Sequence, residues 1–372
     1  MRIALVSDCY PPRLGGIESQ VHGLAHALVQ AGHDVSVLTA TPEGDERGDR
    51  ISIDQGVLVR RLTINLPFDL PVNPFAEHIL RSDLPRYDAV HIHTGIVSPF
   101  ARMATDVCVS LGIPAIVTWH CMLSDAPWYG LVNPIRDWAR AGLILTAVSG
   151  PAAQHIEMLA HSQVVVSTLP NLIDSEPWDS VRTSRPGLSH TLSPLRVVTA
   201  TRLTRRKRVL ALADLIRTAR SRGADLELHI FGDGPLRRRL TRNESSGIIC
   251  HGRVDADALA QAYANADVFV SPVVKEAFGI AALEARASGL PVIYRAGSGI
   301  SEFITHATDG LRVSSDDEMA AALTMLSRHP ARWERLQRGA MSGTTLTWQR
   351  GLGKYIRLYE AARSVRPAGF SH

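Results

Sequence analysis

Residues 266–289 read ADVFVSPVVKEAFGIAALEARASG. The apolar run at the start of this stretch predicts a buried strand, and its alanine-rich end predicts a helix. Two acids, Glu276 and Glu284, stand on either side of the segment FGIAAL. In one continuous helix their carboxylates would lie roughly 80° apart, because each residue advances by about 100°. If the helix instead begins near Gly279, both acids flank whatever binds its N-terminus.

Strand and helix patterns alternate along the whole chain, before and after this stretch. The first half opens with the strand IALVSD, a turn rich in Pro and Gly, an amphipathic helix and the strand DVSVLTA. The second half repeats the alternation from LRVVTATR to LPVIYR. This pattern predicts the α/β class, with two doubly wound, Rossmann-like sheets. A chain of 372 residues also exceeds the size at which one core keeps growing.

The expected domain boundaries follow from composition. The first domain is expected at residues 1–178, and the segment 179–194, rich in Ser, Thr, Pro and Gly, is expected to be a linker. The second domain then covers residues 195–345. Residues 346–372 are expected to form a closing helix and tail that pack back on the first domain. Two such domains usually face each other across a cleft, and ligands bind beyond the carboxyl ends of the strands.

Composition also limits the partners and the compartment. The formal net charge is only +4, a weak hint of anionic partners that falls far short of a nucleic-acid-binding surface. The four cysteines form no CxxC pair, so we expect reduced thiols in a cytoplasmic protein. The first apolar stretch is too short for a secretion signal, and no run reaches the ~20 apolar residues of a membrane-spanning helix. We therefore expect no nucleic-acid partner and no transmembrane segment.

Charged residues follow the expected strands of the second half at their carboxyl ends. Arg202 and Lys207 bracket the turn after VVTAT and suit the phosphates of an anionic ligand without a metal. The helix that opens with FGI offers unpaired amides to the same phosphates. A carboxylate such as Glu284 accepts two ribose hydroxyls. Together with a polyol near Glu276, these groups describe a nucleotide-sugar site.

These residues stand in motifs that resemble a known family. The nine residues EAFGIAALE, preceded by the strand DVFVSP, are similar to the E-x7-E motif of the retaining glycosyltransferases of family 4, which have the GT-B fold. TATRLTRRKR resembles the R-x4-K phosphate clamp of that family, PPRLGGIESQ resembles its glycine-rich first loop, and VTWH resembles its T-x-H strand end. The similarity extends through nearly the whole chain, with the motifs in the same order and at the same spacing.

The resemblance implies a role for each matching residue. His120 and Glu276 are the expected catalytic residues, beside the transferred sugar. The expected donor-binding residues are Arg202 and Lys207 on the diphosphate, Glu284 on the ribose, Gly15 and Gly16 in the first loop, the amides near Phe278, Gly279 and Ile280, and Val254 beside the base. The resemblance implies no metal site and no cofactor, because the nucleoside-diphosphate sugar is a co-substrate.

The implied activity is transfer of a hexose or N-acetylhexosamine from GDP-mannose or a UDP-sugar to a hydroxyl acceptor. The family transfers with retention of the anomeric configuration and without an essential metal. Departures from the family pattern, Leu172 after Asn171 and Ala277 after Glu276, bear on the choice of sugar and acceptor. Two alternatives stay open, a nucleotide-sugar 2-epimerase and a non-catalytic nucleotide-sugar binder.

An aromatic segment at residues 118–142 holds Trp119, Trp128, Tyr129 and Trp138 with few charges. It either packs against the core of its domain or docks on a membrane or a lipid acceptor. A lipid acceptor would place the protein at the inner face of the membrane as a peripheral protein.

Some residues leave a structural and a functional role open. His91 and His93 lie two apart on one strand face, a spacing seen in metal sites, although a hydrogen-bonded strand end is commoner. Asp8 either serves the acceptor or caps a turn. The residues Arg205, Arg206 and Arg208 fit a solvated helix start as well as they fit a phosphate site.

Overall fold

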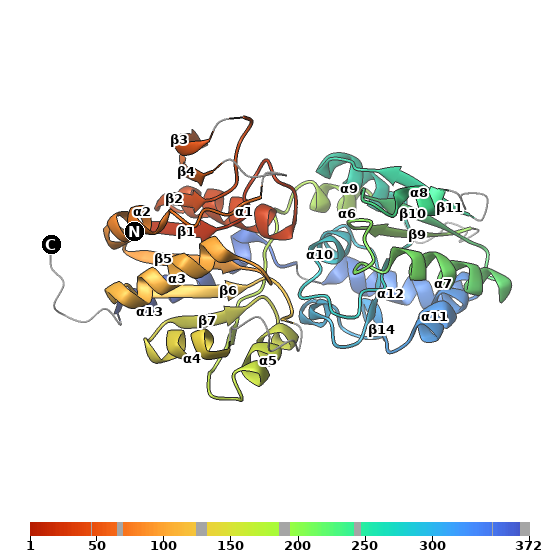
Figure 1. Cartoon of the computed structure of the whole chain (residues 1–372). Helices are drawn as coiled ribbons and strands as arrows, with labels where there is room; N and C mark the ends of the chain where they lie inside the picture. The colour runs from red at the N-terminus through yellow and green to blue at the C-terminus, as the bar shows by residue number, and fades with distance from the viewer. Residues whose placement is uncertain are drawn as a thin grey trace. The chain divides into compact units, whose positions relative to one another are not determined.

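The computed structural model describes residues 1–45, 47–64, 70–123, 132–185, 194–241, 247–343 and 345–364. The chain divides into two compact units (Figure 1). Unit 1 consists of Met1–Ile173 together with the chain from Thr347 onward, and unit 2 consists of Asp174–Leu346. The last helix therefore belongs to the same unit as the first half of the chain.

Unit 1 is built on an eight-stranded sheet with the order β3-β4-β2-β1-β5-β6-β7-β8. Its strands are β1 (Arg2–Ser7), β2 (Asp34–Thr39), β3 (Gly48–Asp54), β4 (Val57–Thr63), β5 (Ala89–Thr94), β6 (Ala115–Trp119), β7 (Ile144–Ala147) and β8 (Ser167–Thr168). All neighbours run parallel except β3 and β4, which form an antiparallel hairpin at one edge. Gln55 and Gly56 turn this hairpin with φ of 45° and 90°, as a type I′ turn requires.

The helices of unit 1 follow from apolar residues at helical spacing. They are α1 (Gly16–Gln30), α2 (Glu77–Asp83), the short η2 (Leu84–Arg86), α3 (Pro99–Leu111), α4 (Val132–Arg140), α5 (Gly150–Leu159) and α13 (Trp348–Ser364). In α1, for example, Val21, Leu24 and Leu28 recur on one face and are fully buried. Helix α13, blue in Figure 1, packs against α1, β5 and β6, and buries Tyr359 there.

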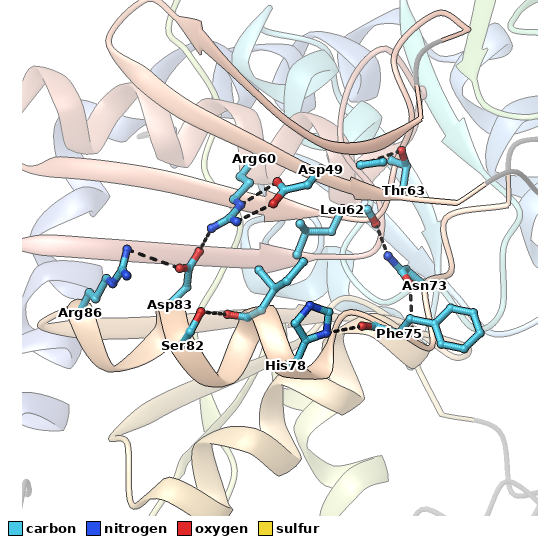
Figure 2. A network of polar contacts seen from close by, with 12 residues as sticks. Asp49, Arg60, Leu62, Thr63, Asn73, Phe75, His78, Ser82, Asp83 and Arg86 are labelled. Carbon is cyan, nitrogen blue, oxygen red and sulfur yellow. Dashed lines mark hydrogen bonds and ion pairs between the residues drawn. The ribbon is translucent and has the colours of Figure 1, made fainter.

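One arginine fixes the β3–β4 hairpin to helix α2. Arg60 donates from Nε and Nη2 to the two carboxylate oxygens of Asp49 at 2.8 and 2.6 Å, and its Nη1 contacts Asp83 (Figure 2). Arg86 lies 3.6 Å from Asp83 as well. Because the side chain of Asp83 is only 8% exposed, these ion pairs are partly shielded from water and hold this end of the hairpin in place.

Unit 2 is built on a six-stranded sheet in which all strands run parallel, with the order β11-β10-β9-β12-β13-β14. Its strands are β9 (Leu195–Ala200), β10 (Leu226–Phe231), β11 (Ile248–Gly252), β12 (Val268–Ser271), β13 (Val292–Arg295) and β14 (Gly310–Val313). The strand order reverses between β9 and β12. In sheets of this kind a ligand binds at that reversal, beyond the carboxyl ends of the two strands.

The helices of unit 2 connect and cover these strands. They are α6 (Trp178–Ser184), α7 (Val209–Ser221), α8 (Arg237–Thr241), α9 (Ala256–Ala264), α10 (Ile280–Ala287), the short η5 (Gly299–Glu302), α11 (Asp316–Arg328) and α12 (Pro330–Ser342). The core between sheet and helices includes the apolar faces of α7 and α11. The α/β class, with two Rossmann-like sheets, is confirmed.

Helix α6 corrects the linker expected at residues 179–194. Trp178 and Val181 are buried, and the Trp178 ring lies 5.8 Å from the ring of Tyr263 on α9. Apolar contacts of this kind make residues 178–184 an integral helix of unit 2, although their composition is polar. Residues 186–193 of the expected linker lie outside the described residues.

Candidate functional site

Two loops meet at the strand reversal of unit 2. Strands β9 and β12 are direct neighbours in the sheet, so the loops that leave their carboxyl ends emerge side by side. The first loop carries Arg202 and Lys207, and the second carries Glu276 and Gly279. Three of the residues expected to bind the donor, Arg202, Lys207 and Gly279, therefore share one edge of the sheet with the expected catalytic residue Glu276.

Lys207 and Glu276 contact each other across this edge. Lys207 Nζ donates to Glu276 Oε2 at 2.6 Å, with the two side chains 31% and 16% exposed. The sequence predicted both residues for the site but not this ion pair. The pair keeps a cation and an anion together where water and a ligand still reach them.

Helix α10 begins at this edge and presents free amides. Ala282 N and Leu283 N both donate to Gly279 O, at 2.9 and 3.1 Å. The amides of Gly279, Ile280 and Ala281 donate to no acceptor within the part of the chain that is described. These three N–H groups and the positive end of the helix dipole suit a phosphate.

The backbone of Gly279 requires glycine. Its φ is +87°, and a Cβ at this position would lie 2.7 Å from Ile300 Cγ1. Gly299 N donates to Glu276 O at 2.8 Å. The segment after β13 therefore holds the loop that follows β12. The side chain of Phe278 is buried, with its ring 5.2 Å from that of Phe303. Ile300 and Phe303 were not predicted for the site, because they only support the residues that could touch a ligand.

Glu284 lies within α10 and is half-buried. Burial raises the pKa of Glu284 to about 8. Its carboxylate forms no hydrogen bond or ion pair with any residue that the structure describes. Tyr263 lies near it and donates to Ala281 O at 3.3 Å. Burial raises the pKa of the Tyr263 phenol, and the negative charge of Glu284 adds to that effect. No motif pointed to Tyr263, which comes from another helix.

The loop after β9 is held by the loop after β10. Leu203 N donates to Asp233 O at 2.9 Å, and a Cβ on Gly232 would lie 1.9 Å from Thr201 O. The glycines of the GDGP loop, residues 232–235, therefore allow its backbone to pack closely against the backbone of the loop after β9. Arg202 is exposed on this loop. Val254 is half-buried and follows β11 at the same edge, two strands farther along the sheet.

The basic run after Arg202 divides into structural and exposed residues. Arg208 donates to Pro272 O at 3.0 Å and contacts Asp316 at 2.7 Å. It therefore ties the β9 loop to the β12 loop and to α11. Arg205 and Arg206 are exposed, as a solvated helix start would have them.

Unit 1 carries three neighbouring histidines, the buried His91 and His93 on β5 and the half-buried His120 directly after β6. His93 Nδ1 lies 2.9 Å from His120 Nε2, and His91 is hydrogen-bonded to Thr118 and Tyr359 at 2.7 and 2.9 Å. Burial lowers the pKa of His120 to about 4 and that of His91 to about 3, so these rings are neutral near pH 7. His91 thus has the hydrogen-bonded strand position that was the commoner of the two alternatives.

The other predicted residues of unit 1 lie at helix N-termini. Asp8 follows β1 and accepts hydrogen bonds from Phe100 N and Ala101 N of α3 at 2.9 and 3.0 Å, so it caps this helix. Gly15 is the N-cap of α1 with an extended φ of 169°, a conformation open to any residue. Gly16 begins the helix and is exposed.

The aromatic segment at residues 118–142 is partly explained by packing. Trp119 and Trp138 are buried, with ring centroids 6.1 Å apart, and Trp138 Nε1 donates to Asp106 at 2.8 Å. Trp128 and Tyr129 lie outside the described residues. Within the described ranges, no helix is both long and apolar enough to cross a bilayer.

Comparisons with known protein families match both units. A model described as glycosyl transferases group 1 matches residues 194–329, and a model described as glycosyltransferase family 4 matches residues 14–177. The chain is 27% identical to a GDP-mannose-dependent alpha-mannosyltransferase of Mycolicibacterium smegmatis, over 99% of this chain and 100% of that protein. It is 26% identical to a GDP-mannose-dependent alpha-(1-6)-phosphatidylinositol dimannoside mannosyltransferase of Mycobacterium tuberculosis, over 96% of this chain and 95% of that protein.

Solved structures match the fold over nearly its full length. Sucrose-phosphate synthase from Thermosynechococcus elongatus superimposes with a TM-score of 0.76 at 18% identity, over 98% of this chain and 99% of that one. Anabaena Alr3699/HepE in complex with UDP superimposes with a TM-score of 0.70 at 16% identity, over 97% and 100%. Both units thus have the sheets and helices of GT-B structures.

Proposed function

The chain belongs to the group 1, family 4 glycosyltransferases, and from this premise we propose that it transfers a hexose or N-acetylhexosamine from a nucleoside-diphosphate sugar to a hydroxyl acceptor with retention of configuration. GDP-mannose is the first donor to test, because two relatives that align over nearly the whole chain are GDP-mannose-dependent. UDP-sugars are the second choice, since Alr3699/HepE is known in complex with UDP and with UDP-glucose. The matched families and relatives are glycosyltransferases, which favours transfer over the epimerase and the non-catalytic binder.

The observation that carries this proposal is the Lys207–Glu276 pair beside the free amides of α10. In the proposed complex the diphosphate lies on these amides, and Lys207 and Arg202 neutralise it. Fixed N–H groups and cations stabilise the charge that develops on the leaving diphosphate without having to reorganise. We propose a metal-independent reaction, since these groups supply the positive charge that a metal otherwise would.

Glu284 is the proposed ribose-binding group. Desolvation disfavours the ionised form of this half-buried carboxyl group, which is why its pKa is raised to about 8. Two ribose hydroxyls would donate to both oxygens and compensate that cost. Val254, at the same edge, is proposed to contact the base.

The proposed chemistry needs no nucleophile from the protein. The departing phosphate oxygen takes the proton of the acceptor hydroxyl, which attacks the anomeric carbon on the same face as the bond that breaks. Glu276 is proposed to hold hydroxyls of the donor sugar while Lys207 faces the phosphate. His120, neutral near pH 7 because its pKa is about 4, is proposed to hydrogen-bond the transferred sugar and not to act as a cation. Gly15 and Gly16 are proposed to bring backbone close to the donor.

The acceptor is proposed to be a hydroxyl of a glycolipid or glycan. This rests on the alignment with the phosphatidylinositol dimannoside mannosyltransferase. A lipid acceptor would make the protein a cytoplasmic enzyme that binds the inner face of the membrane peripherally.

Calorimetric titration of the full chain tests the donor site. Chelator-treated protein is titrated with GDP-mannose, UDP-glucose and UDP-N-acetylglucosamine. We expect one nucleotide sugar to bind, with affinity at least about tenfold weaker in Lys207→Ala and in Glu284→Ala, because each loses a hydrogen-bonded ligand group. Arg206→Ala is the matched control, since it removes one exposed positive charge from the same loop and should bind normally.

Two results would contradict the proposal. One is equal affinity in all the variants, which would leave the pair and Glu284 without a role in the donor site. The other is a glycoside product with inverted anomeric configuration, detected by NMR of the reaction with the donor that binds. A requirement for added Mg²⁺ or Mn²⁺ would contradict metal independence alone.

A further inference from the structure

Three metal-ligand side chains meet in unit 1, away from the carboxyl edge of its sheet. His22 and His26 are four residues apart on α1, and Asp54 ends β3 at the hairpin turn. His22 Nε2 and His26 Nε2 lie 3.3 and 3.5 Å from the same oxygen, Asp54 Oδ2. One candidate ligand atom from each residue can be chosen so that all three lie within 4.8 Å of one another.

The proton on His26 can be placed from its hydrogen bond. His26 Nδ1 lies 2.8 Å from the carbonyl oxygen of His22. A carbonyl only accepts, so Nδ1 carries the hydrogen and Nε2 of the neutral ring bears a lone pair. Nε2 is buried and has no hydrogen-bond partner in the described chain. Its lone pair therefore faces an anionic carboxylate oxygen, an arrangement that needs a positive charge between the two atoms.

No arginine or lysine of the described ranges supplies that charge by pairing with Asp54, which also accepts no hydrogen bond there. Tyr10, only 1% exposed, has a hydroxyl that lacks a hydrogen-bond partner among the same residues. The negative charge of Asp54 reaches this phenol and contributes to its raised pKa, after the larger effect of burial. Two buried polar atoms beside one carboxylate are thus unsatisfied.

We propose that His22, His26 and Asp54 bind a divalent transition-metal ion, Zn²⁺ in the first instance. Ligand atoms about 2.0–2.1 Å from a tetrahedral zinc lie roughly 3.4 Å from one another. The two imidazole-to-carboxylate distances of 3.3 and 3.5 Å match that separation. The hydrogen bond from His26 Nδ1 to a backbone carbonyl is the outer contact that metal-binding histidines usually make.

The ligand set also selects the class of ion. Two imidazoles and one carboxylate suit zinc and its neighbours in the first transition row, whereas Ca²⁺ and Mg²⁺ prefer oxygen ligands alone. His22 and Asp54 side chains are each 42% exposed and that of His26 is 14% exposed. Three protein ligands with access to solvent leave a fourth position for water.

The bound ion would fasten the hairpin to α1. At the hairpin turn, a Cβ on Gly56 would lie 3.1 Å from Val29 of α1, so turn and helix already touch. Arg60 holds the other side of the hairpin to α2 (Figure 2). The metal would supply the corresponding link to α1. The proposed role of the ion is structural and separate from the proposed transfer reaction. The enzymatic activity of chelator-treated protein therefore does not test whether the ion binds.

The competing explanation is a proton in place of the metal. A protonated His26 would form an ion pair with Asp54 and satisfy the same lone pair. The two explanations differ in what titration with zinc does, because metal binding displaces protons from the ligands.

The test is a calorimetric titration of the chelator-treated full chain with Zn²⁺ alone. The visible absorption of the Co²⁺-loaded protein is measured in parallel. We expect one equivalent to bind, with a tetrahedral Co²⁺ spectrum and a rise in Tm. Affinity should fall at least about tenfold in His26→Ala and in Asp54→Asn. His78→Ala is the matched control, since it removes an exposed histidine of unit 1 whose Nδ1 lies 3.0 Å from a backbone oxygen, Phe75 O (Figure 2).

The possible results of the zinc titration either support the site or overturn it. Loss of zinc binding in His26→Ala and Asp54→Asn with normal binding in His78→Ala supports the site. Absence of a one-equivalent site in the unaltered protein would overturn it in favour of the protonated pair, as would equal affinities in all four proteins. Asp54→Asn keeps the size of the side chain, so it distinguishes lost ligation from a misfolded hairpin; circular dichroism of each variant verifies the fold.

Discussion

The carboxyl edges of the two sheets carry different kinds of polar groups. At the edge of the second sheet, Lys207 and Glu276 meet with side chains 31% and 16% exposed. At the edge of the first sheet, Asp8 and His93 are 3% and 2% exposed and are hydrogen-bonded within the protein. The second edge is suited to exchange its ion pair for an ionic ligand. The first edge engages most of its polar atoms in hydrogen bonds within the protein, although His93 Nε2 and His120 Nδ1 have no partner among the described residues.

Burial explains the difference, because it disfavours whichever form of a group is charged. It raises the pKa of Asp8 to about 6 and lowers that of His120 to about 4. Glu284 is the exception at the second edge, since partial burial raises its pKa to about 8. The difference between the two edges can therefore be tested by titration, beginning with that exception.

The largest effect is expected for Glu284→Gln. A pKa raised from 4.5 to about 8 means that the folded protein binds the proton more tightly than the unfolded chain. The free energy of unfolding of the unaltered protein should then fall relative to the variant as the pH rises from about 4.5 to 8, by at most roughly 5 kcal/mol. Chemical denaturation at pH 5, 7 and 9 measures this difference. A difference that stays constant with pH would place the carboxyl group in water.

His120→Gln should show the opposite dependence at the first edge. A histidine pKa lowered from 6.5 to about 4 costs stability as the pH falls, because the unfolded chain takes up the proton first. Relative to the variant, the unaltered protein should lose roughly 3.5 kcal/mol between pH 6.5 and 4. NMR titration of the histidine ring provides a direct measurement, and an ordinary titration near pH 6.5 would show that the ring is not enclosed.

Asp8→Asn is expected to have a slightly smaller effect, with the sign of an acid. Its pKa is raised from 3.8 to about 6, so the unaltered protein should lose roughly 3 kcal/mol relative to the variant as the pH rises across that window. Asparagine loses one of the two hydrogen bonds to α3, a constant cost of about 1 kcal/mol. Because Asp8 and His120 oppose each other between pH 4 and 6, the double variant should show little net change in slope.

The smallest effect is expected for a pair of glycine variants at the second edge. Gly279 and Gly297 both have positive φ, +87° and +78°, so alanine at either position costs roughly 1–2 kcal/mol of backbone strain. Only at Gly279 would the added Cβ also meet Ile300. Gly279→Ala should therefore exceed Gly297→Ala by about 1 kcal/mol in thermal unfolding, and should alone weaken nucleotide-sugar binding. Equal effects would mean that Ile300 moves aside.

Motifs predicted the residues at the second edge but not their contacts. Strand-end position and E-x7-E spacing were enough to select Lys207 and Glu276, since both signals lie within short stretches of sequence. Their ion pair joins residues 69 apart, and only the strand order brings them together. Tyr263 and Ile300 had no signal, because a supporting residue needs the right shape and no particular chemistry.

The β3–β4 hairpin of unit 1 has a recognisable signal in the local sequence. Gln55-Gly56 between two runs rich in β-branched and apolar residues is a hairpin signal, so β3 and β4 could have been predicted. The pair His22 and His26, at a spacing of four, can also be recognised in the sequence. Their third partner, Asp54, could not be assigned, because it reaches α1 only through the packing of that hairpin turn.

The return of the chain to unit 1 has a consequence for its synthesis. Ile173 and Thr347 form a parallel bridge, so the chain leaves unit 1 and re-enters it at one place. A ribosome must therefore produce all of unit 2 before it delivers Trp348–Ser364. Until then β5 lacks its covering helix. His91 also lacks its hydrogen bond to Tyr359, which lies 268 residues farther along the chain. The half of the protein that is made first is thus the half that is completed last.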